Sequence, residues 1–469
     1  MLLNCLFICF LYVSPYFTSV VYTLHTSSSS HRRNDQHIAV LRSAPEPGLF
    51  SSDSKQSQPT NHSIRLFSFD DHTHILLGIR PNDHATLLKR HERSIVLEPN
   101  HLVKIASTDS SYNNNNTSMN GTIMGPYSVQ LDVPSWGLSR ISQRQLPLMN
   151  AFGYPEDAGQ GVDIYIVDSG VDVHHSDFDG RAIWGANFVS GSPDVDENGH
   201  GTIIAGIAAG KHYGVAKKAN IISVKCLAAN GTSDVGTIIE GLHYILQRIQ
   251  SGPQPPRAVI NLSLVAEKSE ALNQATDALS RTGAVIVAAA GNYHENDNTA
   301  KRNACLYSPS SASTVISVGS TDDKDNFATF SNDGKCVSIL APGAAILSDT
   351  MESNAPSSSS SLEVKTWYSG TSYSAPHVSG VLALLYNQQT NRITAHTNVT
   401  QLMYSLATPN LIKDVTQDTV NLLLFNGVET SQMSSIMSST KQKSSACSLH
   451  SMVFSYWTIL FLIILGVLF

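Results

Sequence analysis

Three short motifs supply an acid, a base and a nucleophile in one chain. Asp168 stands in an Asp-Ser-Gly motif, His200 in Gly-His-Gly-Thr and Ser372 in Gly-Thr-Ser. A serine hydroxyl attacks a carbonyl when an imidazole takes its proton and a carboxylate holds that imidazole in the right tautomer. Each motif alone has a simpler interpretation, because Ser, Asp and Gly also cap helices. Together they predict Ser372 as nucleophile, His200 as base and Asp168 as the orienting acid.

The segments around these residues predict how they are positioned. The apolar run 162–167 is typical of a buried parallel strand that delivers Asp168 at its carboxyl end. An apolar helical stretch follows His200. The nearly apolar run 374–385 predicts a buried helix that Pro376 starts, with its N-terminal dipole beside Ser372.

These stretches resemble the subtilisin-like serine proteases (subtilases), and finer details resemble their proteinase K and aqualysin branch. Residues 134–141 are similar to the start of a mature domain in that branch, and 303–309 and 330–337 to aqualysin-like segments. The resemblance covers about 128–426. It implies a three-layer α/β/α fold with a mostly parallel sheet and right-handed crossovers. The expected central strands are 163–167, 221–224, 259–262 and 284–287, and the expected covering helices are 235–250 and 270–281.

The resemblance also implies the rest of a serine endopeptidase site. Asn292 matches the family's oxyanion-hole asparagine, although a turn residue after a strand is its simpler interpretation. Substrate is expected to bind as an extended strand between 230–233 and 263–266. No cofactor is needed for this chemistry. The residues implied to line the substrate cleft are Gly231, Ser233, Ser263, Leu264, Val265, Ala266 and Gly291.

Several positions depart from the family pattern. Ile203 stands where members usually have His, and Tyr373 where they usually have Met. Val265 and Ala266 replace two glycines that leave the wall of the S1 pocket open. A β-branched side chain there should narrow the cleft, which predicts small P1 residues, restricted specificity or little activity on other proteins.

Calcium is the metal that the resemblance would imply. Ser338 follows the Cys-Val pair where the branch has a calcium-binding Asp, and a neutral hydroxyl is a poorer ligand for this hard cation. The sequence therefore argues against structural calcium at this position. The acidic run 322–325 is either another calcium ligand set or, as we favour, a solvated loop.

Composition and the cysteines indicate a secreted protein. A formal charge of −7 argues against a nucleic-acid partner, and only 14% of residues are charged. Residues 1–24 are typical of a secretion signal, which would remove Cys5 and Cys9. Cys305 and Cys336 are then expected to form a disulfide. Cys226 is expected to be a buried thiol, and Cys447 has no evident partner. Sequons for N-glycosylation occur at Asn61, Asn115, Asn116, Asn120, Asn230 and Asn398. Asn261 also stands in a sequon, but we expect it to lie on the strand facing the substrate and to be bare.

Segments on both sides of the protease region have their own interpretation. Residues 25–127 are expected to form an inhibitory α+β propeptide and its linker, with strands near 74–80 and 94–100 and a helical segment at 85–91. We expect processing between about Ser118 and Val129. Residues 427–451 are interpreted as a polar stalk. The apolar tail 452–469 is a GPI-attachment signal or, alternatively, a retained membrane helix, so the protein is expected on the cell surface or outside the cell.

Two functions remain open. The first is an active serine endopeptidase that acts on proteins or peptides and on its own propeptide. The second is a binding protein on a protease scaffold, which cleaves its own propeptide and then keeps it. The departures at Val265, Ala266 and Tyr373 favour the second, whereas the complete set of catalytic motifs favours the first.

Overall fold

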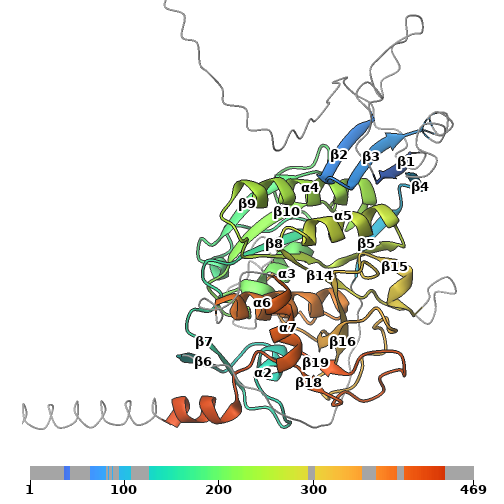
Figure 1. Cartoon of the computed structure of the whole chain (residues 1–469). Coiled ribbons are helices and arrows are strands. Elements are labelled where there is room, and N and C mark those ends of the chain that lie inside the picture. The colour runs from blue at the N-terminus through green and yellow to red at the C-terminus, as the bar shows by residue number, and fades with distance from the viewer. Residues whose placement is uncertain are drawn as a thin grey trace, which may run out of the picture.

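The computed structural model describes residues 36–42, 64–80, 83, 87, 95–106, 126–293, 302–350, 366–387 and 396–438 of the chain (Figure 1). The predicted signal 1–24, most of the helical segment 85–91 and the apolar tail 452–469 lie outside these residues. Within the described part of the chain, no helix combines the length and apolar character needed to cross a membrane.

A nine-stranded sheet forms the centre of the described protease region. Its order is β18-β19-β17-β16-β14-β12-β8-β10-β9, and every neighbouring pair is parallel except β18 with β19. All four strands predicted for the centre are present. The strands are β8 (Asp163–Asp168), β9 (Ala182–Asn187), β10 (Asn220–Lys225), β12 (Ala258–Leu262), β14 (Val285–Ala289), β16 (Ile316–Thr321), β17 (Ile339–Pro342), β18 (Thr408–Pro409) and β19 (Leu422–Leu423).

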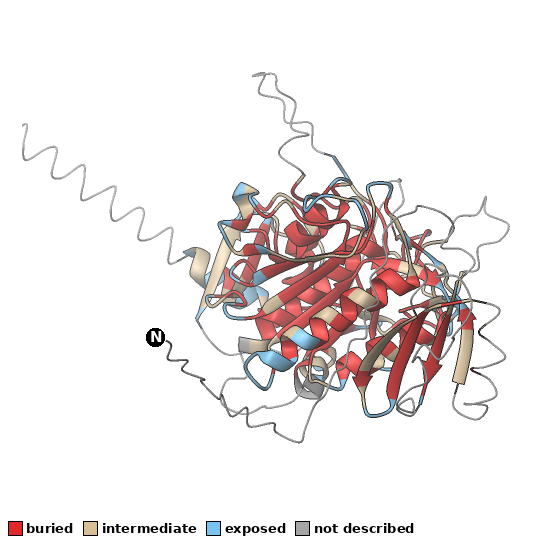
Figure 2. Ribbon diagram, turned by 90° about the horizontal axis from the view of Figure 1, so that it is seen from above, coloured by how far each residue is buried: buried red, intermediate tan, exposed pale blue. Residues whose placement is uncertain are grey.

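Helices cover both faces of this sheet, as predicted (Figure 2). Successive side chains of a strand point to opposite faces, so Ile164 and Ile166 join one core while Tyr165 and Val167 join the other. The first core includes α3 (His200–Ala209), α6 (Thr371–Asn387) and α7 (His396–Leu406). The second includes α4 (Val235–Ser251) and α5 (Glu270–Ser280). Shorter helices are α2 (Trp136–Ile141), η3 (Ser176–Phe178) and η4 (Ala304–Leu306).

A small antiparallel sheet from the N-terminal part of the chain packs on α4 and α5 (Figure 1). Its order is β2-β3-β1-β4, and β3 and β4 coincide with the two strands predicted in this region. Phe69 and Leu77 of this sheet are buried in the same core as α4 and α5. The strands are β1 (His37–Leu41), β2 (Arg65–Asp70), β3 (Thr73–Ile79) and β4 (Ile95–Pro99).

A third sheet joins the N-terminal region to the protease region. Its order is β11-β5-β13-β15, with β11 (Thr232–Asp234), β5 (Leu102–Ile105), β13 (Leu264–Glu267) and β15 (Tyr307–Ser308). β5 comes from the N-terminal region and lies between two protease strands, antiparallel to both. A two-stranded sheet pairs β6 (Tyr127–Leu131) with β7 (Ala151–Pro155).

The protease fold extends further along the chain than predicted. Val428 and Met433 are fully buried in the core that contains α6, and Glu429 forms an ion pair with Arg144 at 3.0 Å. The first part of the expected 427–451 stalk therefore belongs to the folded domain. Met433 and Met437 have the i, i+4 spacing of one helix face, a signal that could have predicted this burial but was masked by the many Ser and Thr residues around it.

Candidate active site

Asp168 and His200 form a buried acid–base pair. Asp168 is the last residue of β8 and His200 the first of α3. Nδ1 of His200 lies 2.8 Å from Oδ1 and 3.0 Å from Oδ2 of Asp168. Nε2 of His200 is buried and has no hydrogen-bond partner among the described residues. His200 can therefore take up a proton at Nε2 while Asp168 stabilises the resulting charge.

Glycine is required next to His200. A Cβ atom on Gly201 would lie 1.9 Å from the carbonyl oxygen of Gly170, which follows β8. Since no side chain fits in that space, Gly201 lets the start of α3 approach the end of β8. The Gly-His-Gly motif is thus explained by the closeness of His200 to Asp168.

Asp196 holds the start of α3, and the sequence analysis missed it. Its Oδ1 accepts hydrogen bonds from the N–H of Gly199 and the hydroxyl of Ser169, both at 2.8 Å. Its Oδ2 accepts from the N–H and hydroxyl of Thr202 at 3.0 and 2.7 Å. A carboxylate before a helix is a capping signal that could have identified it. Asp196 thereby ties the helix of His200 to the loop that follows Asp168.

Ser372 lies in the first turn of α6. The prediction that Pro376 starts this helix was wrong, because the helix begins at Thr371 and Pro376 lies inside it. Proline has no N–H, so it leaves the carbonyl four residues earlier, that of Ser372, without its helical partner. The hydroxyl of Ser263 donates to this carbonyl at 2.8 Å. Because of Pro376, the carbonyl of Ser372 is free to accept this bond, which ties the backbone of Ser372 to the residue that precedes β13.

A buried hydrogen-bond chain continues from Ser263. The Nδ2 atom of Asn261 donates to the Ser263 hydroxyl at 2.8 Å, and the hydroxyl of Ser379 donates to Oδ1 of Asn261 at 2.9 Å. All three side chains are fully buried. The chain joins β12 to α6 and so positions Ser372. Sequence reasoning placed Asn261 on the strand facing the substrate, but it lies in the central sheet, because β12 ends at Leu262 and β13 is a separate strand.

Asn292 lies beside the nucleophile, just beyond β14. Its Oδ1 accepts hydrogen bonds from the N–H and hydroxyl of Thr371, both at 3.0 Å. Because its oxygen is engaged in this way, its Nδ2 is the atom available to donate to a substrate oxygen. The backbone N–H of Ser372 is a second donor, and it already bonds the carbonyl oxygen of Ala106 at 2.9 Å.

β5 occupies the cleft that leads to Ser372. Ile105 donates its N–H to the carbonyl of Gly231 at 3.3 Å, and Ala106 donates to that of Ser263 at 3.4 Å. The hydroxyl of Ser372 makes a short hydrogen bond to the Ala106 carbonyl oxygen. The structure brings together every residue that was expected to line the cleft. In register, Leu264 faces Ile105, Val265 faces Lys104, and Ala266 and Ser233 both face Val103.

Val265 and Gly291 lie against each other beside Ala106. A Cβ atom on Gly291, whose φ is +91°, would lie 3.3 Å from Cγ1 of Val265. Val265 is in β13, the strand expected to form the wall of the S1 pocket, and Gly291 follows β14 and was expected to line the cleft. Ala106 is 2% exposed. The residue held next to Ser372 is therefore small, and a valine side chain lies on the expected wall of the pocket.

Tyr373 packs onto His200. Its ring centroid lies 5.6 Å from that of His200 in an edge-on arrangement and 5.5 Å from that of Tyr368. One turn further along α6, His377 bonds the Tyr373 carbonyl at 2.8 Å, and burial lowers the pKa of His377 to about 4. Tyr373 and Ile203, the two departures nearest the triad, are both buried in the core. They fill space beside the triad without separating Asp168 from His200.

The side chains at the positions considered for calcium make hydrogen bonds and an ion pair within the protein. The Ser338 hydroxyl accepts a hydrogen bond from the N–H of Ser317 at 3.2 Å. The acidic run is not a solvated loop, because Asp325 is buried in an ion pair with Arg140 at 2.7 Å. The Oδ1 of Asp322 accepts two backbone N–H groups of its own turn at 2.9 Å. Within the described ranges, no group of three or more His, Cys, Asp or Glu residues is arranged to hold a metal.

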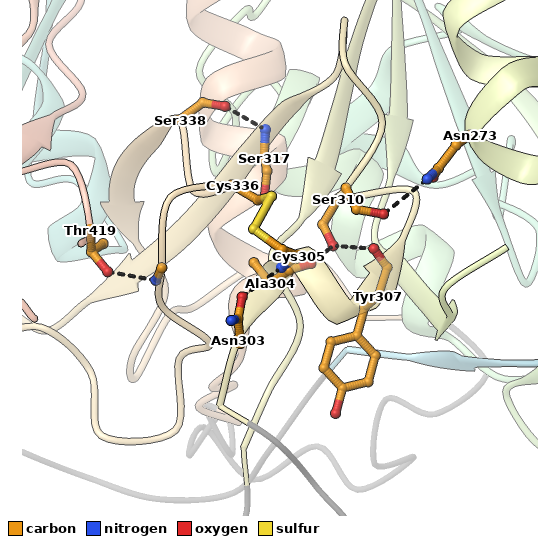
Figure 3. Close-up of a disulfide and its surroundings, with 12 residues drawn as sticks. Asn273, Asn303, Ala304, Cys305, Tyr307, Ser310, Ser317, Cys336, Ser338 and Thr419 are labelled. Atoms are coloured by element: carbon orange, nitrogen blue, oxygen red, sulfur yellow. Dashed lines mark hydrogen bonds between the residues drawn. A yellow bond between two sulfur atoms is a disulfide. The ribbon is translucent and has the colours of Figure 1, made fainter. Parts of the chain in front are cut away.

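The expected disulfide between Cys305 and Cys336 is present (Figure 3). Its Cα atoms lie 5.2 Å apart, and it joins η4 to the loop before β17. Cys226 is a free, fully buried cysteine, as predicted, and burial raises the pKa of its thiol. A thiol with a raised pKa is a weak nucleophile, so Cys226 is a core residue. Cys447 lies outside the described residues.

Comparisons with known proteins identify the family of the chain. The sequence profile of the subtilase family matches residues 159–435. Subtilisin-like protease 3 of Pseudogymnoascus destructans is 40% identical over 287 residues, which are 61% of this chain and 67% of that protein. Cerevisin of Saccharomyces cerevisiae is 36% identical over 310 residues, covering 62% of this chain but only 46% of cerevisin.

A solved structure is also similar. A cold adapted subtilisin-like serine proteinase shares 36% sequence identity with a TM-score of 0.55, and the match covers 63% of this chain and 98% of that structure. The profile match spans more than half of the chain and contains Asp168, His200 and Ser372. The chain therefore belongs to the subtilase family of serine proteases.

Proposed function

We propose that the protein is a secreted or cell-surface serine endopeptidase, made as a zymogen that cleaves itself. The observation that carries this proposal is the position of Ala106, whose carbonyl oxygen contacts both the backbone N–H and the hydroxyl of Ser372. His200 of the acid–base pair packs on Tyr373, the residue after Ser372, and its Nε2 is unpaired among the described residues. Substrate of the same extended form would present its scissile carbonyl to the same groups.

The reaction is acyl transfer. Ser372 attacks the carbonyl carbon while His200 takes its proton at Nε2, and Asp168 stabilises the imidazolium. The N–H of Ser372 and Nδ2 of Asn292 bind the oxyanion; loss of such a donor lowers turnover about 100- to 1000-fold in a subtilisin. His200 then protonates the leaving amine, and water hydrolyses the acyl-enzyme. No cofactor takes part in these steps.

The strand in the cleft supports self-processing at the bond that follows Ala106. This position differs from the expected window between Ser118 and Val129, most of which lies outside the described residues. Val129 itself is paired within β6, where cleavage would break a strand. We therefore assign the intramolecular cut to the bond after Ala106. Any cut between Ser118 and Val129 would then be a second step that trims the new N-terminus. The β1–β5 region then acts as the inhibitory propeptide, with Ala106 filling S1.

The alternative function is a binding protein that cleaves itself and retains its propeptide. The fit of β5 between β11 and β13 favours it, because both edges of the strand are paired. A product held by two strands leaves slowly unless something weakens it. Retention of the propeptide after cleavage, together with no hydrolysis of other proteins, would distinguish this function from that of an endopeptidase.

The decisive experiment compares the secreted protein, without the 452–469 tail, with its Ser372→Ala variant. We expect the wild type to hydrolyse an unstructured protein and the variant to remain unprocessed and inactive. A wild type that matures but cleaves no other protein would favour the binding protein over the endopeptidase.

The disulfide between Cys305 and Cys336 supports an oxidising compartment, and hence secretion. GPI attachment through the C-terminal tail, which lies outside the described residues, remains part of the proposal.

A further inference from the structure

The turn formed by residues 228–231 stands at the rim of the substrate cleft. The N–H of Gly231 donates to the carbonyl of Ala228 at 2.8 Å, and Gly231 has a φ of +73°, which favours glycine. The side chain of Asn198 anchors the turn through the carbonyl of Ala229 at 2.8 Å. Asn230 is exposed at this turn. It directly precedes Gly231, whose carbonyl binds the N–H of Ile105 in the cleft.

The side chain of Asn230 is held in one orientation by its own sequon, Asn-Gly-Thr. Its Oδ1 accepts hydrogen bonds from the N–H of Thr232 at 3.1 Å and from the Thr232 hydroxyl at 2.8 Å. The oxygen of the Asn230 amide is thus engaged, whereas its Nδ2 atom makes no hydrogen bond within the described part of the chain. Nδ2 is the atom that an N-linked glycan modifies.

The sequon at Asn261 provides a contrast within the same molecule. Asn261 is fully buried, and its Nδ2 donates to the hydroxyl of Ser263, the residue at its own sequon's third position. A glycan there is incompatible with the fold. The other candidate asparagines have no described side chain. Asn230 is therefore the sequon asparagine that the described structure leaves exposed, and the disulfide supports the oxidising compartment in which glycans are added.

We propose that Asn230 carries an N-linked glycan that stands at the cleft rim and limits access to extended substrates. This inference rests on the secretion included in the proposed function. In the transfer, Nδ2 forms a bond to the first sugar carbon of a lipid-linked oligosaccharide pyrophosphate. The bond between that carbon and the pyrophosphate oxygen breaks, Nδ2 loses one proton, and the lipid pyrophosphate leaves.

The position explains the expected effect on substrates. A chain that binds like β5 enters between β11 and β13 as a single strand, and it approaches Gly231 with its backbone and with the side chain at the position of Ile105. A folded protein would also bring neighbouring surface against the exposed turn. A bulky hydrophilic glycan there obstructs that surface without touching a single strand. The glycan should therefore reduce cleavage of folded proteins and leave the cleavage of short peptides unchanged.

The first test is a peptide map of the full chain secreted by a eukaryotic host. Release of the glycan by an amidase in heavy-oxygen water converts the modified asparagine into labelled aspartate. We expect the label at Asn230 and none at Asn261. Thr232→Ala should abolish the label, and Thr232→Ser, which keeps the sequon, should retain it. A secreted, active protein with unmodified Asn230 would overturn the inference and leave the proposed function intact.

The second test compares the native enzyme before and after the same amidase treatment. We expect kcat/KM for a folded protein substrate to rise several-fold, with no change for a short peptide that has alanine at P1. Equal changes for both substrates, or none for either, would overturn the effect on access. The peptide map does not require activity, so it shows whether Asn230 is modified even if the protein is inactive. A complete lack of hydrolysis would count only against the proposed function.

Discussion

At the residue scale, we expect Val265 to limit which side chains S1 accepts. Replacing Val265 and Ala266 together by glycine should open the space between β13 and Gly291, because Cγ1 of Val265 lies against Gly291. We expect peptides with leucine or phenylalanine at P1 to gain about tenfold or more in kcat/KM relative to alanine. Ala266→Gly alone serves as the matched control. Unchanged P1 preference in the double variant would show that Val265 does not form the pocket wall.

The sequence predicted those site residues that can be recognised from a short motif of neighbouring residues. Asp168, His200 and Ser372 each stand in a short motif, so their types and neighbours were enough. Asp196 lies four residues before His200 and was still missed, because a local capping signal does not show the bond from the Ser169 hydroxyl, which exists only once α3 meets β8. Ala106 could not be predicted at the nucleophile, since only the threading of β5 between β11 and β13 places it there.

At the scale of elements, the N-terminal region caps the two helices on which it packs. Both oxygens of Glu98 accept hydrogen bonds at the start of α5, from the N–H of Glu270 at 2.8 Å and of Ala271 at 3.2 Å. The hydroxyl of Ser269 also donates to it. On α4, Oδ1 of Asn100 accepts from the N–H of Gly236 at 2.9 Å. These groups would otherwise lack a helical partner, and a carboxylate also interacts favourably with the helix dipole.

Glu98→Ala should therefore weaken the contact of the propeptide with the protease domain. A buried hydrogen-bonded carboxylate of this kind contributes about 1–3 kcal/mol, so inhibition by the cleaved propeptide should weaken by roughly tenfold. Asn100→Ala removes one neutral acceptor and should have a smaller effect. The inhibition constant of the propeptide, measured with both variants, tests this order. Equal losses would show that the charge on Glu98 adds nothing.

The elements themselves were more predictable than their boundaries. Strands of the central sheet are continuous apolar runs, because helices bury both faces, and all four predicted ones are present. The start of α6 was misplaced because proline usually marks the first turn of a helix, whereas Pro376 lies inside this one. The hydrogen bond from Ser263 compensates for the missing helical bond, and that partner is more than a hundred residues away.

At the scale of the whole molecule, the N-terminal sheet β1–β4, which we propose to be the propeptide, shares an interface with the protease domain that contains His243. This α4 residue is 6% exposed, and its ring lies 5.2 Å from that of Phe67 and 5.5 Å from that of Phe69, both edge-on. Two ion pairs cross the same interface, from Arg65 to Glu240 at 2.6 Å and from Arg281 to Asp70 at 2.5 Å. Burial lowers the pKa of His243 below its ordinary value of 6.5.

This lowered pKa predicts release of the propeptide at acidic pH. Once the propeptide leaves, Phe67 and Phe69 no longer cover His243, so its pKa should return toward 6.5. Below that pH the free enzyme binds a proton that the complex excludes, so the complex loses stability as the pH falls from about 6.5 toward the lowered value. Burial alone would raise the pKa of Asp70, but its contacts with Arg281 hold it below 3.8, so this ion pair persists in that window.

We therefore expect the self-cleaved complex to retain its propeptide at neutral pH and to lose it in mildly acidic buffer. In His243→Gln, which cannot take up this proton, retention should depend less on pH. His74 in β3 also has a pKa lowered by burial, so His74→Gln is the matched control for titration within the propeptide itself. Propeptide that co-purifies with the protease domain across this pH range is the measurement. The same pH dependence in His243→Gln as in wild type would assign release to other groups. If loss at acidic pH coincides with the onset of proteolysis, the interface acts as an inhibitor that acid removes, and the protein is a protease whose activity begins after it reaches an acidic environment.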